Sequence, residues 1–497
     1  MRLSFIAEQP ATVRHTSRNS EGMTFRHSTN RWFSQRYNTN NAWIFNGNNG
    51  NLNNNNVNNS NRCQAVTNLL KLTNKQIKTQ KVAKKMTEEY ITQWLIETMY
   101  TTRKNKRYGR DSIDFERRWT PELRRMSHEL ATRSFRVERN YAFLTSIPKW
   151  REIFATEFQG RMADHLLCDS LSPYIERELH PRTFNNRIGK GSQAAINQVI
   201  EDIAEATNGY HAEARIIKWD LKGFFPSANL DIMCGMFCDL INRHSDDIVE
   251  ETGQDEMPEF LKWLAMVIIH CRPQTHCELR TPWRLWSEHI SPEKSLFGKD
   301  AGIGAPIGRM TSQTGMGLYL NDEVRWLNDE CGIRSTLFMD DCVMVVPERL
   351  HSYAISLFPE LRQRLAAKGV RMNEKKFYDQ PYQHGLEFLG SHIHPWSIIL
   401  NDATYARAIT RIHEYNAIPS SEKYFHLDRF ISTINSYTGL LKNRTSFRRV
   451  CQLRDAIADD WWQWIDWDRR RLCVMSKPQY TFRARLNDNY HLNLKRL

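Results

Sequence analysis

Phe338-Met339-Asp340-Asp341 places two adjacent carboxylates between two apolar runs, residues 336–338 and 342–346. Runs of β-forming residues on both sides of so short a polar pair predict a β-hairpin with the aspartates at its tip. Adjacent like charges repel, so two carboxylates at one tip indicate a site for a multivalent cation that neutralises them. The ordinary alternative for an Asp-Asp pair is a solvated turn.

A third carboxylate follows a second strand pattern. Residues 215–219 read as a short strand that leads to Asp220, and residues 221–227 then stop the strand. Two strands would thus bring together Asp220, Asp340 and Asp341. Three acids are the minimum for two Mg²⁺ ions about 4 Å apart, which activate a hydroxyl and stabilise a leaving pyrophosphate. The sequence therefore predicts a two-metal site for Mg²⁺, with Mn²⁺ as the alternative ion.

Further motifs follow in a fixed order along the chain. They are Asp220 with Phe224-Phe225, residues 302–313, Phe338-Met339-Asp340-Asp341, Asn373-Glu374-Lys375-Lys376 and Phe388-Leu389-Gly390. This series resembles the palm motifs of a reverse transcriptase, and residues 147–153 and 187–192 are similar to the finger motifs of that family. The resemblance implies an α+β fold, a right-hand polymerase with helical fingers, an antiparallel-sheet palm and a helical thumb. It also implies RNA-directed DNA polymerase activity.

The same resemblance divides the chain. Residues 86–205 would form the fingers and residues 206–400 the palm, with an insertion at about 240–300. Residues 401–497 would form a helical thumb and a C-terminal extension, and residues 1–85 an Asn-rich N-terminal extension.

The resemblance also assigns catalytic roles. Asp220, Asp340 and Asp341 would hold the metal ions, with the backbone carbonyl of Leu221 as a further ligand. Lys376 matches a position proposed to protonate the leaving pyrophosphate, and a surface lysine is the alternative interpretation.

Other positions are candidates for binding the incoming nucleotide. Arg187 and Lys190 fall where the fingers of the family reach the triphosphate, a task that suits the planar fork of arginine. Phe225 falls where an aromatic ring faces the sugar and excludes a ribose 2′ hydroxyl, although a core aromatic is the alternative. Gly308 and Gln313 are further substrate-binding candidates in the motif at residues 302–313.

Two positions depart from the common family pattern. Phe338 replaces the usual Tyr, and Ile307 replaces a Gln whose amide can bond near the nascent base pair. Loss of that amide is expected to loosen base selection. An apolar residue before Gly308 is similar to the reverse transcriptases of diversity-generating retroelements, which make errors at template adenines. Related alternatives are reverse transcriptases of antiphage defence and of group II introns, and a catalytically silent nucleic-acid binder.

Residues 38–61 are more than half Asn. So polar a segment cannot bury enough surface to offset its ordering entropy, so we expect it to be mobile or prone to aggregation. It also resembles the adenine-rich repeat of diversity-generating retroelements read as protein, since Asn codons begin with two adenines. An ordinary Asn-rich tail is the alternative, and under the retroelement interpretation Met86 is the expected start of the enzyme proper.

Composition favours a polyanionic partner. Lys and Arg number 69 against 56 Asp and Glu, for a net charge of +13 and a pI near 9.2. The expected partners are a template RNA, the cDNA product, deoxynucleotide triphosphates and, by resemblance, a small basic accessory protein. No apolar stretch is long enough to span a membrane and no signal-peptide pattern is present, so the sequence predicts a cytoplasmic protein.

Ten cysteines without a regular framework fit reduced thiols. His270-Cys271 and His276-Cys277 offer zinc-ligand side chains, but their spacing matches no common zinc motif. Tryptophans in the insertion predict a packed accessory element, and those near the C-terminus predict mainly core packing. They are Trp263, Trp283 and Trp286, and Trp461, Trp462, Trp464 and Trp467.

Overall fold

The computed structural model describes residues 41–46, 51–56, 86–104, 109–146 and 149–480. The chain divides into two units, Met1–Val82 and Ala83–Leu497. In the first unit, β1 (Asn41–Asn46) pairs antiparallel with β2 (Asn51–Asn56). Otherwise the predicted mobile extension lies outside the described residues.

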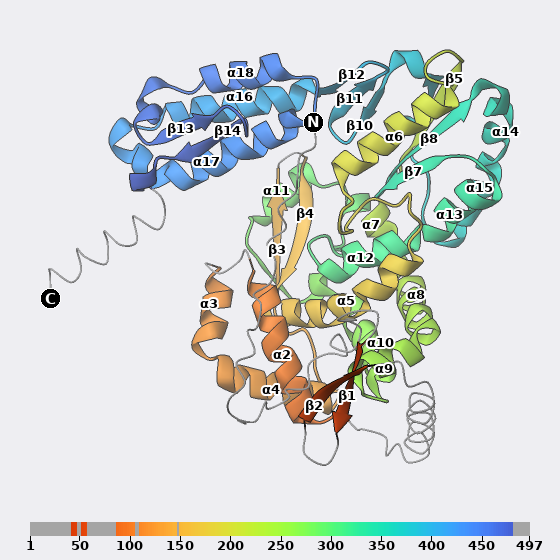
Figure 1. Cartoon of the computed structure of the whole chain (residues 1–497), viewed down its shortest axis with the longest axis vertical. Helices are drawn as coiled ribbons and strands as arrows, with labels where there is room; N and C mark the ends of the chain where they lie inside the picture. Colours follow the sequence, from red (N-terminus) through yellow and green to blue (C-terminus); the bar gives the residue numbers. More distant parts are fainter. Residues whose placement is uncertain (1–40, 47–50, 57–85, 105–108, 147–148, 481–497) are drawn as a thin grey trace. The chain divides into compact units, whose positions relative to one another are not determined.

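The second unit begins with helices. Thr87 caps the first of them, because its side chain accepts a hydrogen bond from the Tyr90 amide. Two glutamates in the first turn interact favourably with the positive end of the helix dipole. These helices are α2 (Glu88–Arg103), α3 (Arg110–Arg117), α4 (Trp119–Ala131), α5 (Phe158–Glu178) and α6 (Ser192–Ala206) (Figure 1). The apolar faces of α2, α3, α4 and α5 share one core with α8 (Leu230–Arg243) and α10 (Met257–Ile269), whereas α6 packs in a second core.

The insertion completes a small sheet. β3 (Asn140–Thr145) pairs antiparallel with β4 (Arg151–Thr156) and parallel with β6 (Cys277–Leu279). From α11 (Trp283–His289), the buried Trp286 donates a hydrogen bond from its indole Nε1 to Glu152 at 2.8 Å. Of the three tryptophans predicted to pack, Trp286 is buried and Trp263 is partly buried against the main core, whereas Trp283 is exposed. The insertion also contains α9 (Ser245–Thr252).

A four-stranded antiparallel sheet lies at the centre of the second unit. Its order is β7 (Ser335–Phe338), β8 (Asp341–Pro347), β5 (Ala214–Trp219) and β9 (Tyr378–Pro381). Along β8, Val343 and Val345 face a core with α6, while Cys342 and Met344 face the opposite core. Because both faces of the sheet are covered, this strand is apolar throughout, not alternating.

Short helices connect and cover these strands. They are α7 (Phe224–Ser227), α12 (Met310–Tyr319), α13 (Asn321–Arg325), α14 (His351–Ser356) and α15 (Phe358–Ala367).

The C-terminal part has its own core. A small sheet of β10 (Leu386–Phe388), β11 (Ser391–His394) and β12 (Ser397–Leu400) leads to α16 (Asp402–Asn416), α17 (Ser420–Lys442) and α18 (Phe447–Asp455). Trp461 is fully buried and stacks on Phe430, with the two ring centroids 3.9 Å apart. The other three tryptophans are partly buried and pack against the same core. Core packing of these rings is confirmed. A hairpin of β13 (Ile465–Asp468) and β14 (Cys473–Ser476), which helical periodicity did not predict, completes this core.

The predicted α+β class is confirmed by this combination of helices and mainly antiparallel sheets. No helix within the described ranges is both long enough and apolar enough to cross a membrane.

Candidate active site

The predicted hairpin at the two aspartates is confirmed. β7 and β8 pair with Phe338 opposite Asp341, so Met339 and Asp340 form the turn. Met339 has a φ of 58°, and Asp340 does not have a positive φ. This is the φ pattern of a type II′ hairpin turn, in which glycine usually takes the first central position.

Asp220 joins the pair because of the sheet register. It directly follows β5, whose last residue Trp219 lies opposite Cys342, the neighbour of Asp341. Asp220 is buried, with 3% of its surface exposed. The structure therefore brings all three predicted carboxylates to one end of two adjacent strands.

Residues 371–376 form the other wall of the site. The Asn373 amide donates to the Asp220 carbonyl at 2.8 Å, and its side-chain Nδ2 donates to Asp220 Oδ1 at 3.3 Å. The Lys376 ammonium lies 2.5 Å from Asp220 Oδ2. Leu221 forms an isolated antiparallel β-bridge with Met372, which fixes the backbone that follows Asp220. Lys376 thus reaches the carboxylates as predicted, whereas the role of Asn373 was not foreseen.

A second lysine, Lys218, also reaches the site. Its ammonium lies 3.3 Å from Asp341 Oδ1 and donates to the Glu387 carbonyl at 3.1 Å. Sequence reasoning missed this residue. The sequence could have indicated it, because Lys218 lies two residues before Asp220 and side chains at that spacing share one face of a strand.

The electrostatics of the site reflect crowding of like charges. Burial, with the nearby charges of Asp341 and Asp220, raises the pKa of Asp340 to about 6. Partial burial lowers the pKa of Lys376, but the hydrogen bond to Asp220 and the surrounding carboxylates outweigh it and raise this pKa above its usual value. The site therefore favours bound cations.

The donor chemistry of the site fits Mg²⁺, which prefers carboxylate oxygens. In the conformation described, no three acidic, His or Cys side chains of the described ranges are grouped to hold one metal ion together. The lysine ammonium groups of Lys376 and Lys218 instead contact Asp220 and Asp341. A metal ion would have to displace these contacts.

The segment at residues 302–309 lines the site beside Phe225. The Ala305 amide donates to the Phe225 carbonyl at 2.8 Å, and the Ile307 carbonyl accepts from the Phe154 amide at 2.8 Å. Gly308 has a φ of 117°, and a Cβ there would lie 2.6 Å from the Phe154 carbonyl oxygen, so only glycine fits. The half-buried Phe225 meets Phe224 edge-on.

A buried ion pair anchors this segment. Arg309 donates to Asp164 Oδ1 at 2.9 Å and to Oδ2 at 3.2 Å, and Thr311 donates to Oδ1 at 2.7 Å. Gln313 follows on α12, where its carbonyl accepts a hydrogen bond from Asn186 at 3.2 Å.

Arg187 and Lys190 lie in the loop between α5 and α6. The Arg187 guanidinium donates to Glu176 Oε2 at 2.9 Å and to the His180 carbonyl at 2.8 Å. Lys190 donates to the Pro181 carbonyl at 2.6 Å. Lys190 is thus engaged within the loop and Arg187 with both the loop and the end of α5, and their contact with a triphosphate stays a prediction.

The His/Cys cluster of the insertion is dispersed. His270 bonds to Asp231 at 2.9 Å and His276 to Thr275 at 2.8 Å. Burial raises the pKa of the Cys271 thiol, against the opposing effect of Arg309. Within the described ranges these side chains belong to no group of three or more that could hold a metal ion.

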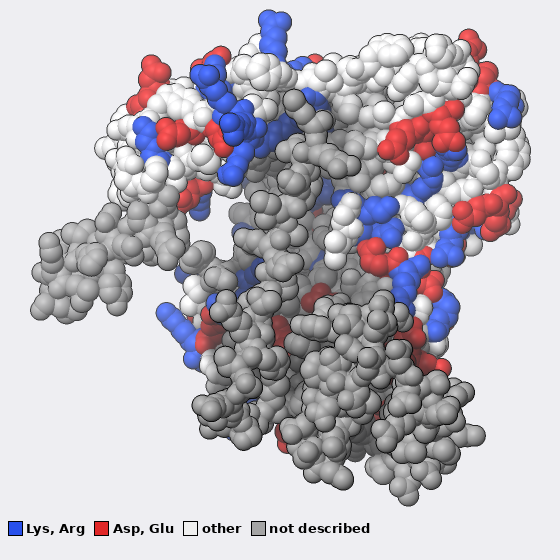
Figure 2. Space-filling model, viewed as in Figure 1, with Lys and Arg blue, Asp and Glu red and all other residues white. Residues whose placement is uncertain are grey.

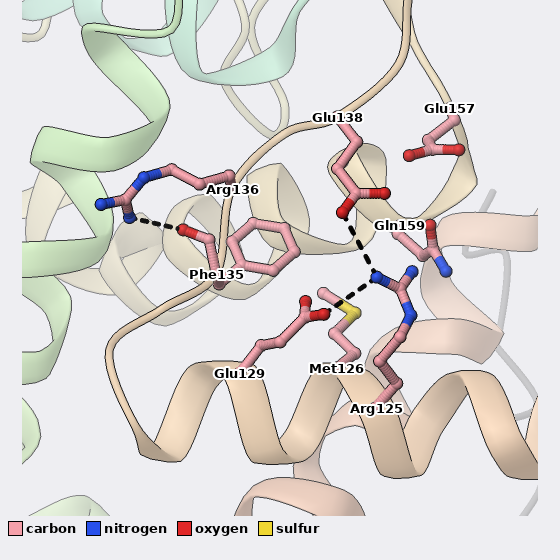
Figure 3. A pocket seen from close by; sticks show the side chains of 9 residues that line it. Arg125, Met126, Glu129, Phe135, Arg136, Glu138, Glu157 and Gln159 are labelled. Atoms are coloured by element: carbon pink, nitrogen blue, oxygen red, sulfur yellow. Dashed lines mark hydrogen bonds and ion pairs between the residues drawn. The ribbon is translucent and has the colours of Figure 1, made fainter.

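A separate pocket beside α4 is filled by its own side chains. Its lining includes the Arg125 guanidinium, which lies 2.9 Å from Glu129 Oε1 and 3.6 Å from Glu138 Oε1, as Figure 3 shows. The remaining space is too small for a water molecule. On the face shown in Figure 2, Lys and Arg side chains gather over the C-terminal helices, and both signs of charge are mixed elsewhere.

Comparison with known proteins finds little. No protein-family model matches the chain, and no curated protein matches it. Among solved structures, telomerase from Candida albicans in complex with a fragment of telomeric RNA is similar, with a TM-score of 0.35 and 10% identity. The match covers 66% of this chain and 59% of that one, so the chain spans about three fifths of its length. So remote a likeness supports no inference, and the function must be argued from the site.

Proposed function

We propose that this chain is an RNA-directed DNA polymerase that makes cDNA from a template RNA. The observation that carries the proposal is the convergence of Asp220, Asp340 and Asp341 at one end of β5 and the β7–β8 hairpin. Crowded carboxylates with a raised pKa at Asp340 favour multivalent cations. In this proposal the central sheet is the palm, residues 86–205 are the fingers and residues 401–497 include the thumb.

Each residue near the carboxylates has a role in nucleotidyl transfer. Two Mg²⁺ ions held by the three aspartates and the Leu221 carbonyl would activate the primer hydroxyl and stabilise the pyrophosphate. Lys376 is protonated at neutral pH, as a proton donor to pyrophosphate requires, and its raised pKa agrees with this. Phe225, fixed by the Ala305 hydrogen bond, would close the sugar site against a 2′ hydroxyl.

The biological setting we favour is a diversity-generating retroelement. Ile307 supports it, because its backbone is held by Phe154 and its apolar side chain offers no hydrogen bond near the base pair. Antiphage defence is the alternative setting for the same chemistry. A neighbouring adenine-rich repeat paired with a variable gene would support the retroelement, and a position among defence genes would support the alternative.

Primer extension on an RNA template tests the activity. Asp220→Asn and Asp340→Asn should each lower the rate by at least about 10³-fold, because metal binding is lost, while RNA affinity changes little. Asp379→Asn is the matched control, since Asp379 lies in the same sheet but is paired with Arg215 and His351. Extension by either site variant at the rate of the unaltered protein would refute the proposal.

A further inference from the structure

The turn that carries Asp340 is strained. Met339 adopts a φ of 58°, in the left-handed region that non-glycine residues seldom occupy. Such a conformation is unfavourable for a residue with a side chain and persists only where the surroundings impose it. Something must therefore hold the Met339 peptide in place.

Asn185 supplies that support. Its side-chain Oδ1 accepts a hydrogen bond from the Met339 amide at 3.2 Å. Asn185 is 3% exposed, and its Nδ2 lies 3.4 Å from where a Cβ on Gly317 of α12 would be. Nδ2 finds no hydrogen-bond partner within the described part of the chain. A buried donor without a partner is unfavourable, so this amide is retained for what its oxygen does at Met339.

The loop that carries Asn185 is joined to the edge of β7. The Phe184 amide donates to the Leu337 carbonyl at 3.0 Å, and the Leu337 amide donates to the Arg182 carbonyl at 2.9 Å. These backbone bonds fix the position of Asn185 along the hairpin. The loop is therefore held against β7, the strand that ends at the turn.

Arg187 anchors the other side of the loop. Its Nε donates to Glu176, its Nη1 to the carbonyls of His180 and Thr183, and its Nη2 to the Glu176 carbonyl at 3.3 Å. The side chain is only 7% exposed. All three guanidinium nitrogens donate hydrogen bonds to other groups of this protein, and a lysine could not reproduce this planar set of bonds.

We propose that Arg187 and Asn185 form a clamp that positions Asp340. Arg187 is a positioning residue in this scheme: it holds the loop, the loop places Asn185, and Asn185 holds the Met339 peptide. The proposal rests on the proposed function for its catalytic consequence, but the clamp itself is a property of the fold. It gives Arg187 a role distinct from direct contact with the triphosphate.

Hydrogen exchange of the full chain tests the clamp without any activity. Asn185→Ala and Arg187→Lys should each speed exchange at the Met339 amide by about fivefold, the factor that corresponds to the loss of one hydrogen bond worth about 1 kcal/mol. The matched control is Asn186→Gly, which removes a neighbouring amide at a φ of 52° that glycine accepts. Unchanged exchange in Asn185→Ala would overturn the clamp whether or not the protein makes DNA.

Steady-state kinetics separate the two roles of Arg187. A positioning residue predicts that Arg187→Lys lowers kcat and raises the Mg²⁺ concentration for half-maximal rate, as Asn185→Ala does, with the KM for deoxynucleotide little changed. A raised KM with unchanged kcat and Mg²⁺ dependence would identify a triphosphate ligand and overturn this role. Absence of DNA synthesis in the unaltered protein would refute the proposed function and leave the exchange result to decide the clamp.

Discussion

Acidic side chains at two places in this chain meet positively charged partners in different ways. Asp164 meets Arg309 in the core, with 3% and 2% of their side chains exposed and two hydrogen bonds between them. The carboxylates at the end of the central sheet are contacted by Lys218 and Lys376, and the side chain of Lys376 is 46% exposed. The first group is balanced in charge. Among the residues described around the second, three carboxylates face two ammonium groups.

The difference separates a structural ion pair from a reactive site. Fixed bidentate geometry holds Arg309 in place, and removing either partner would leave a buried charge without compensation. A half-exposed lysine on a flexible chain can be displaced, and the excess negative charge beneath it favours a more highly charged cation. Burial first, and then the two neighbouring carboxylates, raises the pKa of Asp340, which agrees with that excess.

The largest expected effect breaks the balanced pair. Arg309→Met should lower the free energy of unfolding by about 3–5 kcal/mol, because Asp164 would remain buried and charged. Denaturant titration measures this, with Arg334→Met as the control. Arg334 is 38% exposed in its pair with Glu205, so its loss should cost at most about 1 kcal/mol. Equal losses in the two variants would contradict the distinction.

A smaller effect of opposite sign is expected at the unbalanced group. Because the pKa of Asp340 is raised to about 6 in the folded protein, its charged form destabilises the fold above pH 6. Asp340→Asn should therefore stabilise the metal-free protein by about 2 kcal/mol at pH 8. The gain should shrink as the pH falls below 6, where Asp340 is itself protonated.

Asp379→Asn is the control with reversed sign. Burial raises the pKa of Asp379, but hydrogen bonds from Arg215 and His351 outweigh this and lower it. Its charge therefore stabilises the fold above the unfolded pKa, and the substitution should destabilise at pH 8 and lose its effect in acid. Thermal unfolding in the presence of a chelator measures both variants. A destabilised Asp340→Asn at pH 8 would contradict the crowding argument.

The smallest effect concerns Ile307, which precedes Arg309 of the balanced pair by two residues. The balanced pair at Arg309 anchors its backbone, so a substitution there changes chemistry without moving the segment. Ile307→Gln supplies an amide worth about 1 kcal/mol, enough to lower misincorporation several-fold, most visibly at template adenines. Sequencing products from both proteins on one RNA decides it. If the two proteins misincorporate at template adenines at the same rate, Ile307 is not the cause of the errors.

The carboxylate site could be predicted because its signals are local. Two apolar runs around Asp340-Asp341 specify a hairpin, and a strand before Asp220 supplies the third acid. Lys376 was predicted as a site residue only from the resemblance to reverse transcriptases. Contacts that depend on packing were not predictable: nothing local shows that Arg187 turns back onto Glu176 in α5 or that Asn185 reaches Met339. The β13–β14 hairpin was missed because the alternation of β13, Ile465-Asp466-Trp467-Asp468, is only four residues long.

The edge formed by residues 371–376 has a consequence for biosynthesis. Asn373 lies 153 residues beyond Asp220. At ~5–20 residues per second, a ribosome adds that stretch in roughly 8–30 s. Throughout this interval the nascent chain has made Asp220 but neither Asn373 nor Lys376, so nothing yet offsets the charge of that carboxylate from this side. The incomplete sheet also exposes the free edge of β5 until β8 and then β9 emerge, which makes this interval the one in which a chaperone would be most needed.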